Sequence, residues 1–150
     1  MATIAMEKEK RYARAGFTLM EILIAVMILG LLSALVAPAV FSIYKSQQKK
    51  AAQSSLQGFK KGIQMYQMHV GALPTTLKDL IKKPKDEKAA KKWEHPYVGD
   101  DWTEIPEDPW GEKFVYKVTP GGKHPYEMYS YGPNGKGSPK EEQISVWTEK

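Results

Sequence analysis

Acidic side chains crowd one short stretch of the chain, where paired carboxylates could act as a general acid and a general base. Seven Asp and Glu residues lie from Trp93 to Glu112, and no Lys or Arg lies among them. Acid–base chemistry needs two carboxylates held at a fixed separation. Because Pro106 and Pro109 interrupt the stretch, the pattern predicts a solvated loop instead of a catalytic pair.

The three histidines could also do chemistry, as ligands of a zinc ion. His69, His95 and His124 lie far apart, and His95 and His124 each precede a proline. A zinc site brings several such ligands together around one ion. We therefore expect three surface histidines and no zinc site.

The segment Gly135–Ser138 (Gly-Lys-Gly-Ser) has the composition of a phosphate-binding loop. Only two residues separate Gly132 from Gly135, which is too few for that motif, and no helix is predicted after it. The chain has no Cys, so a cysteine nucleophile, a thiolate metal site and a disulfide are excluded. We expect that this protein is not an enzyme.

Charge is distributed unevenly along the 150 residues, whose net charge is +5. From Lys45 to Lys92, 12 Lys against three acids give +9, and from Trp93 to Lys150, six Lys against 11 acids give −5. Opposite patches suit head-to-tail contacts between subunits, and two solvated faces are the alternative. The basic region has few interleaved aromatic residues, so nucleic-acid binding is not expected.

The elements that must position these residues begin with a long uncharged segment. The 23 residues from Ile22 to Tyr44 carry no charge, which is enough to cross a hydrocarbon core of ~30 Å as a helix. The head before it, Met1–Gly16, has four Lys and Arg against two Glu. The positive-inside rule keeps this head in the cytoplasm and sends the C-terminal part across the membrane.

The junction between the head and the uncharged segment allows two interpretations. Ala37-Pro38-Ala39 has the small-x-small pattern of a signal-peptidase site, which would give a secreted soluble protein cleaved after Ala39. The apolar run, however, continues beyond Ala39, and Glu21 lies at the start of the apolar segment. A carboxylate near hydrocarbon is costly and usually has a partner or a function.

The stretch Arg14–Ala25 (RAGFTLMEILIA) resembles the class III signal of type IV pilins and pseudopilins. In that family a prepilin peptidase cuts after the glycine, here Gly16, and methylates the new N-terminal residue, here Phe17. A glutamate at the fifth position of the mature chain, here Glu21, is a hallmark of the family. The resemblance implies a filament subunit that is anchored in the inner membrane.

Glu21 has a physical role to play in such a filament. Cleavage would give Phe17 a free α-amino group that is mostly charged at neutral pH. Pairing Glu21 of one subunit with the Phe17 amine of its neighbour neutralises both groups, and a wrong register leaves both unpaired. We expect this pair to set the register of assembly. The alternative is a carboxylate that reaches water at the membrane surface.

Gly30 and Pro38 lie eight residues apart inside the apolar segment. Proline removes a backbone donor and clashes with the carbonyl of Ala34, so the helix is weakened there. Related pilins have glycine and proline at the equivalent places, and their helix melts locally between them on assembly. The resemblance therefore implies a role in assembly for Gly30 and Pro38, with simple tolerance of these residues in membrane helices as the alternative.

Apolar residues after this segment recur at steps of three and four, which predicts an amphipathic helix. The stripe is Ala52, Leu56, Phe59, Ile63, Tyr66 and Val70. One helix is therefore expected from Phe17 to Val70, ended by Gly71 and Pro74. On it, Gly58 and Gly62 predict close packing.

The remaining elements are short. We expect a helix at Thr75–Lys82 with Thr75 or Thr76 as its cap, and a loop or frayed helix at Lys83–Lys92. Alternating or β-rich runs predict three strands, at 113–118, 126–131 and 144–148. The predicted fold class is α+β, a long N-terminal helix packed on a small antiparallel sheet, as in pilins.

One branch of the family fits best, the major pseudopilin of type II secretion systems. The matching pieces are Gly71–Thr75, Asp108–Gly111, Tyr131–Gly135 and Ile144–Trp147. The alternatives are a type IV pilus subunit or a minor pilin with a binding role. The expected organisation is a cleaved leader (1–16), a membrane and filament-core helix (17–44) and a periplasmic domain (45–150). The implied partners are copies of itself, the prepilin peptidase, the inner-membrane assembly platform and minor pseudopilins.

That branch often ties its C-terminal loop with a calcium ion. Calcium takes six to eight oxygen ligands, mostly carboxylates and carbonyls. The family's acidic positions fall here on Asn134, Glu141 and Gln143, two of which are amides. The sequence leaves open a calcium loop and a loop held by its own hydrogen bonds.

Overall fold

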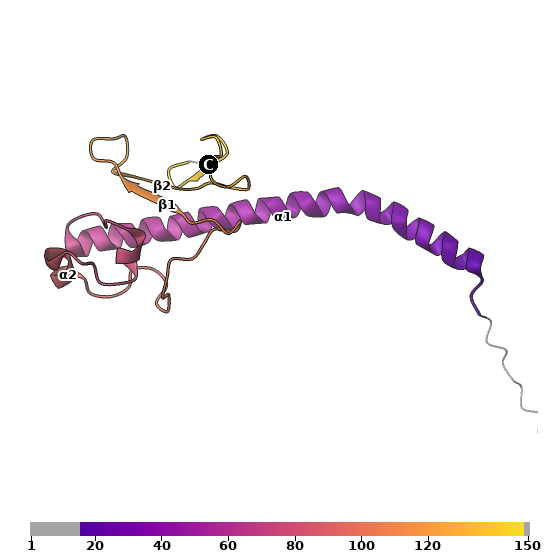
Figure 1. Ribbon diagram of the computed structural model, residues 1–150, viewed down its shortest axis with the longest axis horizontal. Helices are drawn as coiled ribbons and strands as arrows, with labels where there is room; N and C mark the ends of the chain where they lie inside the picture. Colours follow the sequence, from indigo (N-terminus) through magenta and orange to yellow (C-terminus); the bar gives the residue numbers. More distant parts are fainter. Residues whose placement is uncertain (1–15, 149–150) are drawn as a thin grey trace, which may run out of the picture. The chain divides into compact units, whose positions relative to one another are not determined.

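The structure is a computed structural model that describes residues 16–148 (Figure 1). Its elements are α1 (Leu19–Val70), the 3₁₀ helix η1 (Leu77–Leu80), α2 (Glu87–Lys92), β1 (Val115–Val118), β2 (Tyr126–Ser130) and β3 (Ile144–Ser145). The chain divides into two compact units, Met1–Phe41 and Ser42–Lys150. The predicted leader lies outside the described residues except for Gly16.

Helix α1 begins at Leu19, two residues later than predicted. The Thr18 hydroxyl accepts a hydrogen bond from the Glu21 backbone N–H at 3.2 Å, so Thr18 is the N-cap and Phe17 precedes the helix. The predicted end is confirmed. Gly71 adopts φ +84° and its N–H donates to the Gln67 carbonyl at 2.9 Å, which closes the last turn.

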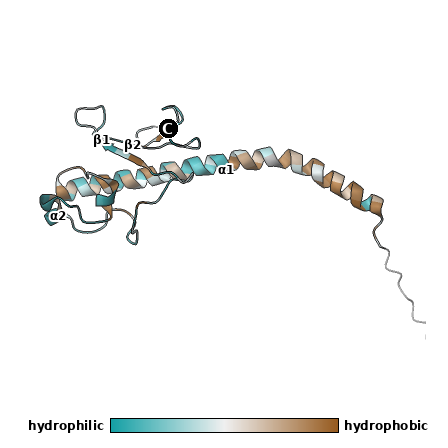
Figure 2. Cartoon of the chain, in the orientation of Figure 1, coloured by the Kyte–Doolittle hydropathy of each residue, from teal (hydrophilic) through white to brown (hydrophobic). Residues whose placement is uncertain are grey.

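The second half of α1 supplies the core of the second unit. All six residues of the predicted apolar stripe are buried, and four of them are at most 1% exposed. Figure 2 shows many polar residues on this half of the helix, while the earlier part is mostly hydrophobic. The 3.6-residue period of the stripe therefore correctly predicted which face is buried.

Gly62 lets a loop cross α1 closely. A Cβ placed on Gly62 would lie 2.4 Å from Val98 Cγ1 and 3.1 Å from the Tyr97 carbonyl oxygen, whereas nothing lies within 4 Å of one on Gly58. The two glycines that the sequence paired thus differ. Of this pair, Gly62 has the predicted close packing and Gly58 does not.

The connection between α1 and the sheet contains less helix at 75–82 than predicted. The helix expected at 75–82 is the single 3₁₀ turn η1, where the Thr76 N–H donates to Asp79 Oδ2 at 2.9 Å. The Lys-rich segment contains α2, whose N-cap Asp86 accepts from the Ala89 N–H at 2.8 Å. The Tyr97 N–H donates to the Leu80 carbonyl at 2.7 Å, and this bond ties the loop after α2 to the end of η1.

The sheet has three antiparallel strands in the order β1-β2-β3. Val115 pairs with Tyr129, and Tyr129 pairs on its other side with Ser145. Tyr126, Met128 and Ser130 of β2 alternate inward and are buried. In Figure 1, β1 and β2 lie beside the second half of α1, and this face of the sheet completes the core.

All three strands are shorter than predicted. β1 lacks Lys113 and Phe114, and the Phe114 ring packs edge-on against Phe59 of α1, with ring centroids 5.3 Å apart. β2 stops at Ser130 because Gly132 turns the chain with φ +78°. β3 is only two residues long, since the Trp147 N–H donates to Ser145 Oγ and Thr148 N–H to the Ser145 carbonyl in a turn.

The acidic stretch forms the predicted loop, but one of its carboxylates is structural. Asp108 is 5% exposed, and its Oδ1 accepts hydrogen bonds from the backbone N–H groups of Trp110 and Glu112 at 3.0 and 2.9 Å. Gln48 of α1 donates to the Pro109 carbonyl at 3.2 Å. These bonds fix the Asp-Pro-Trp-Gly turn against α1.

Candidate assembly interface

The first half of α1 has no protein cover in the described chain. Between Leu19 and Phe41 every large apolar side chain is exposed, by 48% to 82%. An 18-residue window of α1 has a mean hydropathy of 2.6, and the helix is long and apolar enough to cross a membrane. A helix that is apolar all round requires lipid or neighbouring helices around it.

Thr18 and Glu21 form a capping box at the start of this helix. The Glu21 N–H donates to Thr18 Oγ1 at 3.2 Å, and the Thr18 N–H donates to Glu21 Oε2 at 3.5 Å. The carboxylate also lies near the positive end of the helix dipole. Glu21 thus has a role within one chain that the sequence analysis missed, although the pattern Thr-x-x-Glu before an apolar run is its signal.

The predicted cleavage point lies ahead of the helix. Gly16, Phe17 and Thr18 are all exposed and outside α1, and the Phe17 side chain is 80% exposed. No atom lies within 4 Å of a Cβ placed on Gly16. The Gly16–Phe17 peptide bond is therefore accessible and outside helical hydrogen bonding.

Gly30 and Pro38 lie inside an unbroken helix. α1 continues through both residues, with Pro38 in its interior. Between them the Ser33 hydroxyl donates to the Leu29 carbonyl at 2.7 Å, a bond that competes with the helix ladder. Helix melting between Gly30 and Pro38 on assembly stays a prediction.

The C-terminal loop, Gly132–Gln143, is closed by its own hydrogen bonds. The Asn134 amide donates to Glu142 Oε2 at 2.6 Å, and the Gln143 amide donates to the Ser138 carbonyl at 2.9 Å. Ser138 Oγ donates to the Gly135 carbonyl at 2.6 Å. Of the three residues predicted to bind calcium, two are thus engaged through their NH₂ groups, while their amide oxygens can still accept.

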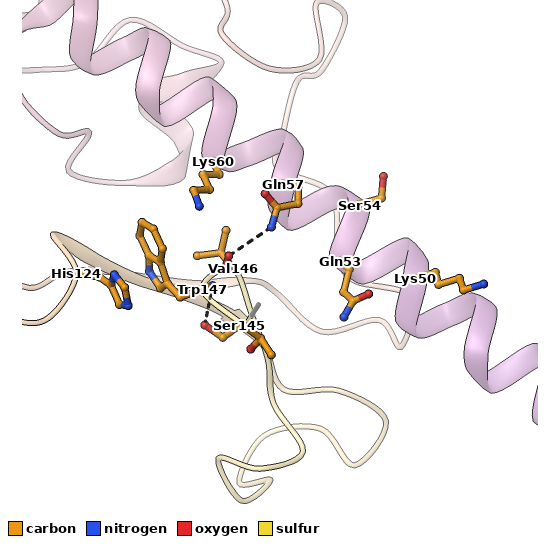
Figure 3. Close-up of a pocket in the computed structure, with 10 residues that line it drawn as sticks. Lys50, Gln53, Ser54, Gln57, Lys60, His124, Ser145, Val146 and Trp147 are labelled. Carbon is orange, nitrogen blue, oxygen red and sulfur yellow. Dashed lines mark hydrogen bonds between the residues drawn. The ribbon is translucent and has the colours of Figure 1, made fainter. Parts of the chain in front are cut away.

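A pocket of about 700 Å³ lies between α1 and the end of β3 (Figure 3). Trp147 forms one wall: His124 stacks on it with ring centroids 4.2 Å apart, and Lys60 Nζ lies 4.3 Å from its ring centroid. The Trp147 indole N–H donates to the Tyr126 carbonyl at 2.8 Å. Burial raises the pKa of Tyr126 to about 12.

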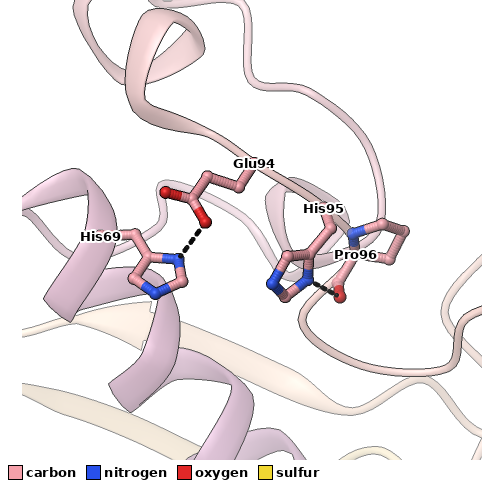
Figure 4. Close-up of polar contacts among 4 residues, drawn as sticks. All are labelled: His69, Glu94, His95 and Pro96. Carbon is pink, nitrogen blue, oxygen red and sulfur yellow. Dashed lines mark hydrogen bonds and ion pairs between the residues drawn. The ribbon is translucent and has the colours of Figure 1, made fainter.

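Two of the three histidines lie close together, so the prediction that they are far apart is wrong for this pair. The ring centroids of His69 and His95 are 5.9 Å apart, and His69 Nδ1 lies 3.6 Å from Glu94 Oε2 (Figure 4). The sequence could not show this, because the contact joins the end of α1 to a loop more than 20 residues later. His124 lies instead against Trp147.

Comparisons with known proteins agree with this arrangement. The family model of type II secretion system protein G matches residues 39–147, and that of the prokaryotic N-terminal methylation motif matches residues 11–37. Type II secretion system core protein G of Pseudomonas aeruginosa is 35% identical over 144 residues, covering 92% of this chain and 98% of that protein. Type II secretion system core protein G of Dickeya chrysanthemi is 32% identical over 134 residues, covering 87% of this chain and 82% of that protein.

A solved structure shares the fold. The crystal structure of the major pseudopilin from the type 2 secretion system of enterohaemorrhagic Escherichia coli covers 73% of this chain and 94% of its own, with a TM-score of 0.57 and 22% identity. A bare apolar helix followed by an α+β domain defines a pilin-like subunit. The chain belongs to the type II secretion system protein G family, the major pseudopilins, which are structural subunits of the secretion pseudopilus.

Proposed function

We propose that this pseudopilin polymerises through the first half of α1 and so supports export of folded proteins across the outer membrane. The observation that carries the proposal is the bare apolar segment Leu19–Phe41, joined to a domain that has its own core. Lipid covers such a helix before assembly, and the same helices of neighbouring subunits cover it in a filament. The helix then exchanges one apolar environment for another.

Processing begins the assembly route in this proposal. A prepilin peptidase cuts between Gly16 and Phe17 and methylates the new amino group of Phe17. The exposed, non-helical peptide bond and the match to the N-terminal methylation motif support this step. The same support argues against the alternative cleavage after Ala39.

Glu21 then changes partners. In the single chain its carboxylate accepts from the Thr18 N–H at 3.5 Å, which is a long bond. The amine of Phe17 in a neighbouring subunit is charged and offers a stronger, charge-assisted bond. Burial of both charges in a packed helix bundle makes their pairing a requirement for correct register. Gly30 and Pro38 provide the weak segment that lets the helix adjust.

The proposed topology has one membrane span. The leader, residues 1–16, stays in the cytoplasm, residues 17–44 form the span in the inner membrane, and residues 45–150 lie in the periplasm. The basic head and the uncharged segment support this orientation. The proposed partners are the prepilin peptidase, the inner-membrane assembly platform, minor pseudopilins and further copies of the chain.

The C-terminal loop fits a calcium ion in part. Asn134 and Gln143 can offer amide oxygens, and Glu141 and Glu142 can offer carboxylates, which is a weak set for an ion that prefers several charged ligands. The Asn134 NH₂ group donates to Glu142 Oε2 at 2.6 Å, which leaves the Asn134 amide oxygen able to bind an ion. Calcium at Asn134, Glu141 and Gln143 is therefore proposed as a weak site, which would hold a loop that already has its own bonds.

The experiment expresses the full chain in a secretion-competent bacterium that lacks its own major pseudopilin. We expect restored secretion, filaments on overexpression, and a mature chain that begins with N-methyl-Phe17 by mass spectrometry. A matched variant, Phe41→Lys, charges the bare helix while leaving the core of the second unit intact, and it should abolish filaments. Unrestored secretion by the correctly processed wild-type chain would contradict the proposal.

A further inference from the structure

A cluster of side chains far along α1 from the apolar segment brings together three ligands that suit a metal ion. His69 lies in the last turn of α1, and Glu94 and His95 lie just after α2. One ligand atom of each residue lies within 4.8 Å of the other two. Figure 4 shows the Glu94 carboxylate and the His95 ring directed toward the space beside His69.

The separation of His69 Nδ1 and Glu94 Oε2 matches that of two ligands on one ion. These atoms are 3.6 Å apart, too far for a hydrogen bond. Nδ1 is buried and has no hydrogen-bond partner among residues 16–148. Two ligands of a tetrahedral zinc ion, with bonds of about 2.0–2.2 Å, lie about 3.3–3.5 Å apart. Small movements of the two side chains would therefore let a zinc ion lie between them, and His69 Nδ1 would then have the ion as its partner.

His95 is held in the tautomer that a metal needs. Its Nδ1 lies 2.8 Å from the Pro96 carbonyl oxygen. A carbonyl only accepts, so Nδ1 carries the proton and Nε2 keeps a free lone pair. Figure 4 shows Nε2 on the side of the ring that faces His69. A backbone carbonyl on the second nitrogen is the usual way to orient a metal-bound histidine.

A buried aromatic ring backs the cluster on one side, and an exposed carboxylate borders it on the other. Tyr97 is buried and packs on both rings, with centroids 5.5 Å from His69 and 5.2 Å from His95. The Glu94 side chain is 63% exposed and can move onto an ion without disturbing the core. Preorganised histidines and one adjustable carboxylate are suited to binding.

We propose that His69, Glu94 and His95 bind one zinc ion, which ties the end of α1 to the loop after α2. Two imidazoles and one carboxylate suit zinc better than calcium or magnesium, which prefer oxygen alone. Three protein ligands leave the fourth tetrahedral position to water. The three ligands belong neither to the apolar segment Leu19–Phe41 nor to the predicted calcium loop, so the zinc site adds a function that the family assignment does not contain.

The test uses the untagged full chain in detergent, since a histidine tag would itself bind zinc, after metal is removed with a chelator. Calorimetric titration with zinc should give one site per chain, and the melting temperature should rise by about 5 °C or more at a hundredfold excess over Kd. Cobalt(II) should give the visible absorption bands of a tetrahedral site with nitrogen ligands.

Variants then assign the ligands. His69→Ala, Glu94→Gln and His95→Ala should each weaken zinc binding at least about tenfold, and the double histidine variant should abolish the zinc-dependent shift. Glu94→Gln changes an exposed side chain, so it tests the site even if His69→Ala unfolds. His124→Ala is the matched control and should bind like the wild type. The proposal is overturned if the wild type shows no zinc-dependent shift, or if Glu94→Gln and His95→Ala bind as well as the wild type.

Discussion

Ser130 Oγ donates a hydrogen bond of 2.5 Å to Asp108 Oδ2, and both residues are buried. The same hydroxyl oxygen accepts from the Gly132 N–H at 3.0 Å. One carboxylate therefore fastens the Asp-Pro-Trp-Gly turn to the end of the central strand β2. The Ser130 hydroxyl thus links the turn to Gly132, the first residue of the C-terminal loop.

Asp108→Ala should destabilise the second unit by about 3 kcal/mol, because it leaves two backbone N–H groups and the Ser130 hydroxyl buried without an acceptor. Asp108→Asn keeps one acceptor oxygen and should lose about half as much. The measurement is urea unfolding of the full chain in detergent, followed by tryptophan fluorescence. The control Asp101→Ala, at an exposed acid, should change the free energy of unfolding by less than about 0.5 kcal/mol.

Gly62→Ala and Gly58→Ala should shift stability in opposite directions. A methyl group on Gly62 meets Val98 and the Tyr97 carbonyl, and such overpacking costs about 1–3 kcal/mol. A methyl group on Gly58 meets open space and improves helix propensity by up to about 1 kcal/mol. Thermal melts of the two variants give the comparison, and equal melting temperatures would contradict the close approach at Gly62.

Gly16→Leu should block maturation and leave membrane insertion intact, because the peptidase then meets a bulky side chain at the bond that it cuts. The chain should migrate at precursor size and stay in the membrane fraction on fractionation. Gly30→Leu, at an exposed glycine inside α1, is the matched control and should be cut normally. A Gly16→Leu chain of mature size would refute the proposed processing point.

Glu21→Ala and Thr18→Ala should separate helix capping from pairing between subunits. Both changes remove the capping box, which stabilises a helix start by about 1 kcal/mol. Only Glu21→Ala also leaves the Phe17 amine of a neighbour without a partner in the packed helices. Filament yield from membranes should fall far more for Glu21→Ala, and equal yields for the two variants would reduce the role of Glu21 to a cap.

Calcium should raise the melting temperature of the full chain if the C-terminal loop binds it. With one or two carboxylates we expect a Kd of about 10⁻⁴–10⁻³ M, so the shift needs millimolar calcium. Melts with calcium and then with chelator give the result. Loss of the shift in Glu141→Ala would support the predicted ligands, and identical melts with and without calcium would mean that the loop is held by hydrogen bonds such as Asn134–Glu142 alone.

The sequence predicted features that depend on neighbours a few residues apart. The spacing of Leu56, Phe59 and Ile63 identified the buried face of α1, and Gly71 identified its end, because both signals repeat or act within one or two helical turns. The capping box of Thr18 and Glu21 is equally local, but it lies within a longer motif that also predicts a role for Glu21 in assembly.

The features that the sequence did not predict join residues distant along the chain. Asp108 meets Ser130 across 22 residues, and His69 meets Glu94 and His95 from another element, so no spacing rule could pair them. The start of β1 likewise depends on a contact with a residue distant along the chain. Phe114 is a residue type that favours strands, yet it lies before the start of β1, and its ring packs on Phe59.

Val146 and Trp147, which follow β3, contact the middle of α1, and this affects when the second unit can fold. Gln57 donates to the Val146 carbonyl at 3.3 Å across 89 residues, and Lys60 lies over Trp147. Contacts of such long sequence separation slow folding, and these cannot form until residues 146 and 147 have been synthesised. The core of the second unit is therefore completed only after almost all of its residues have been made.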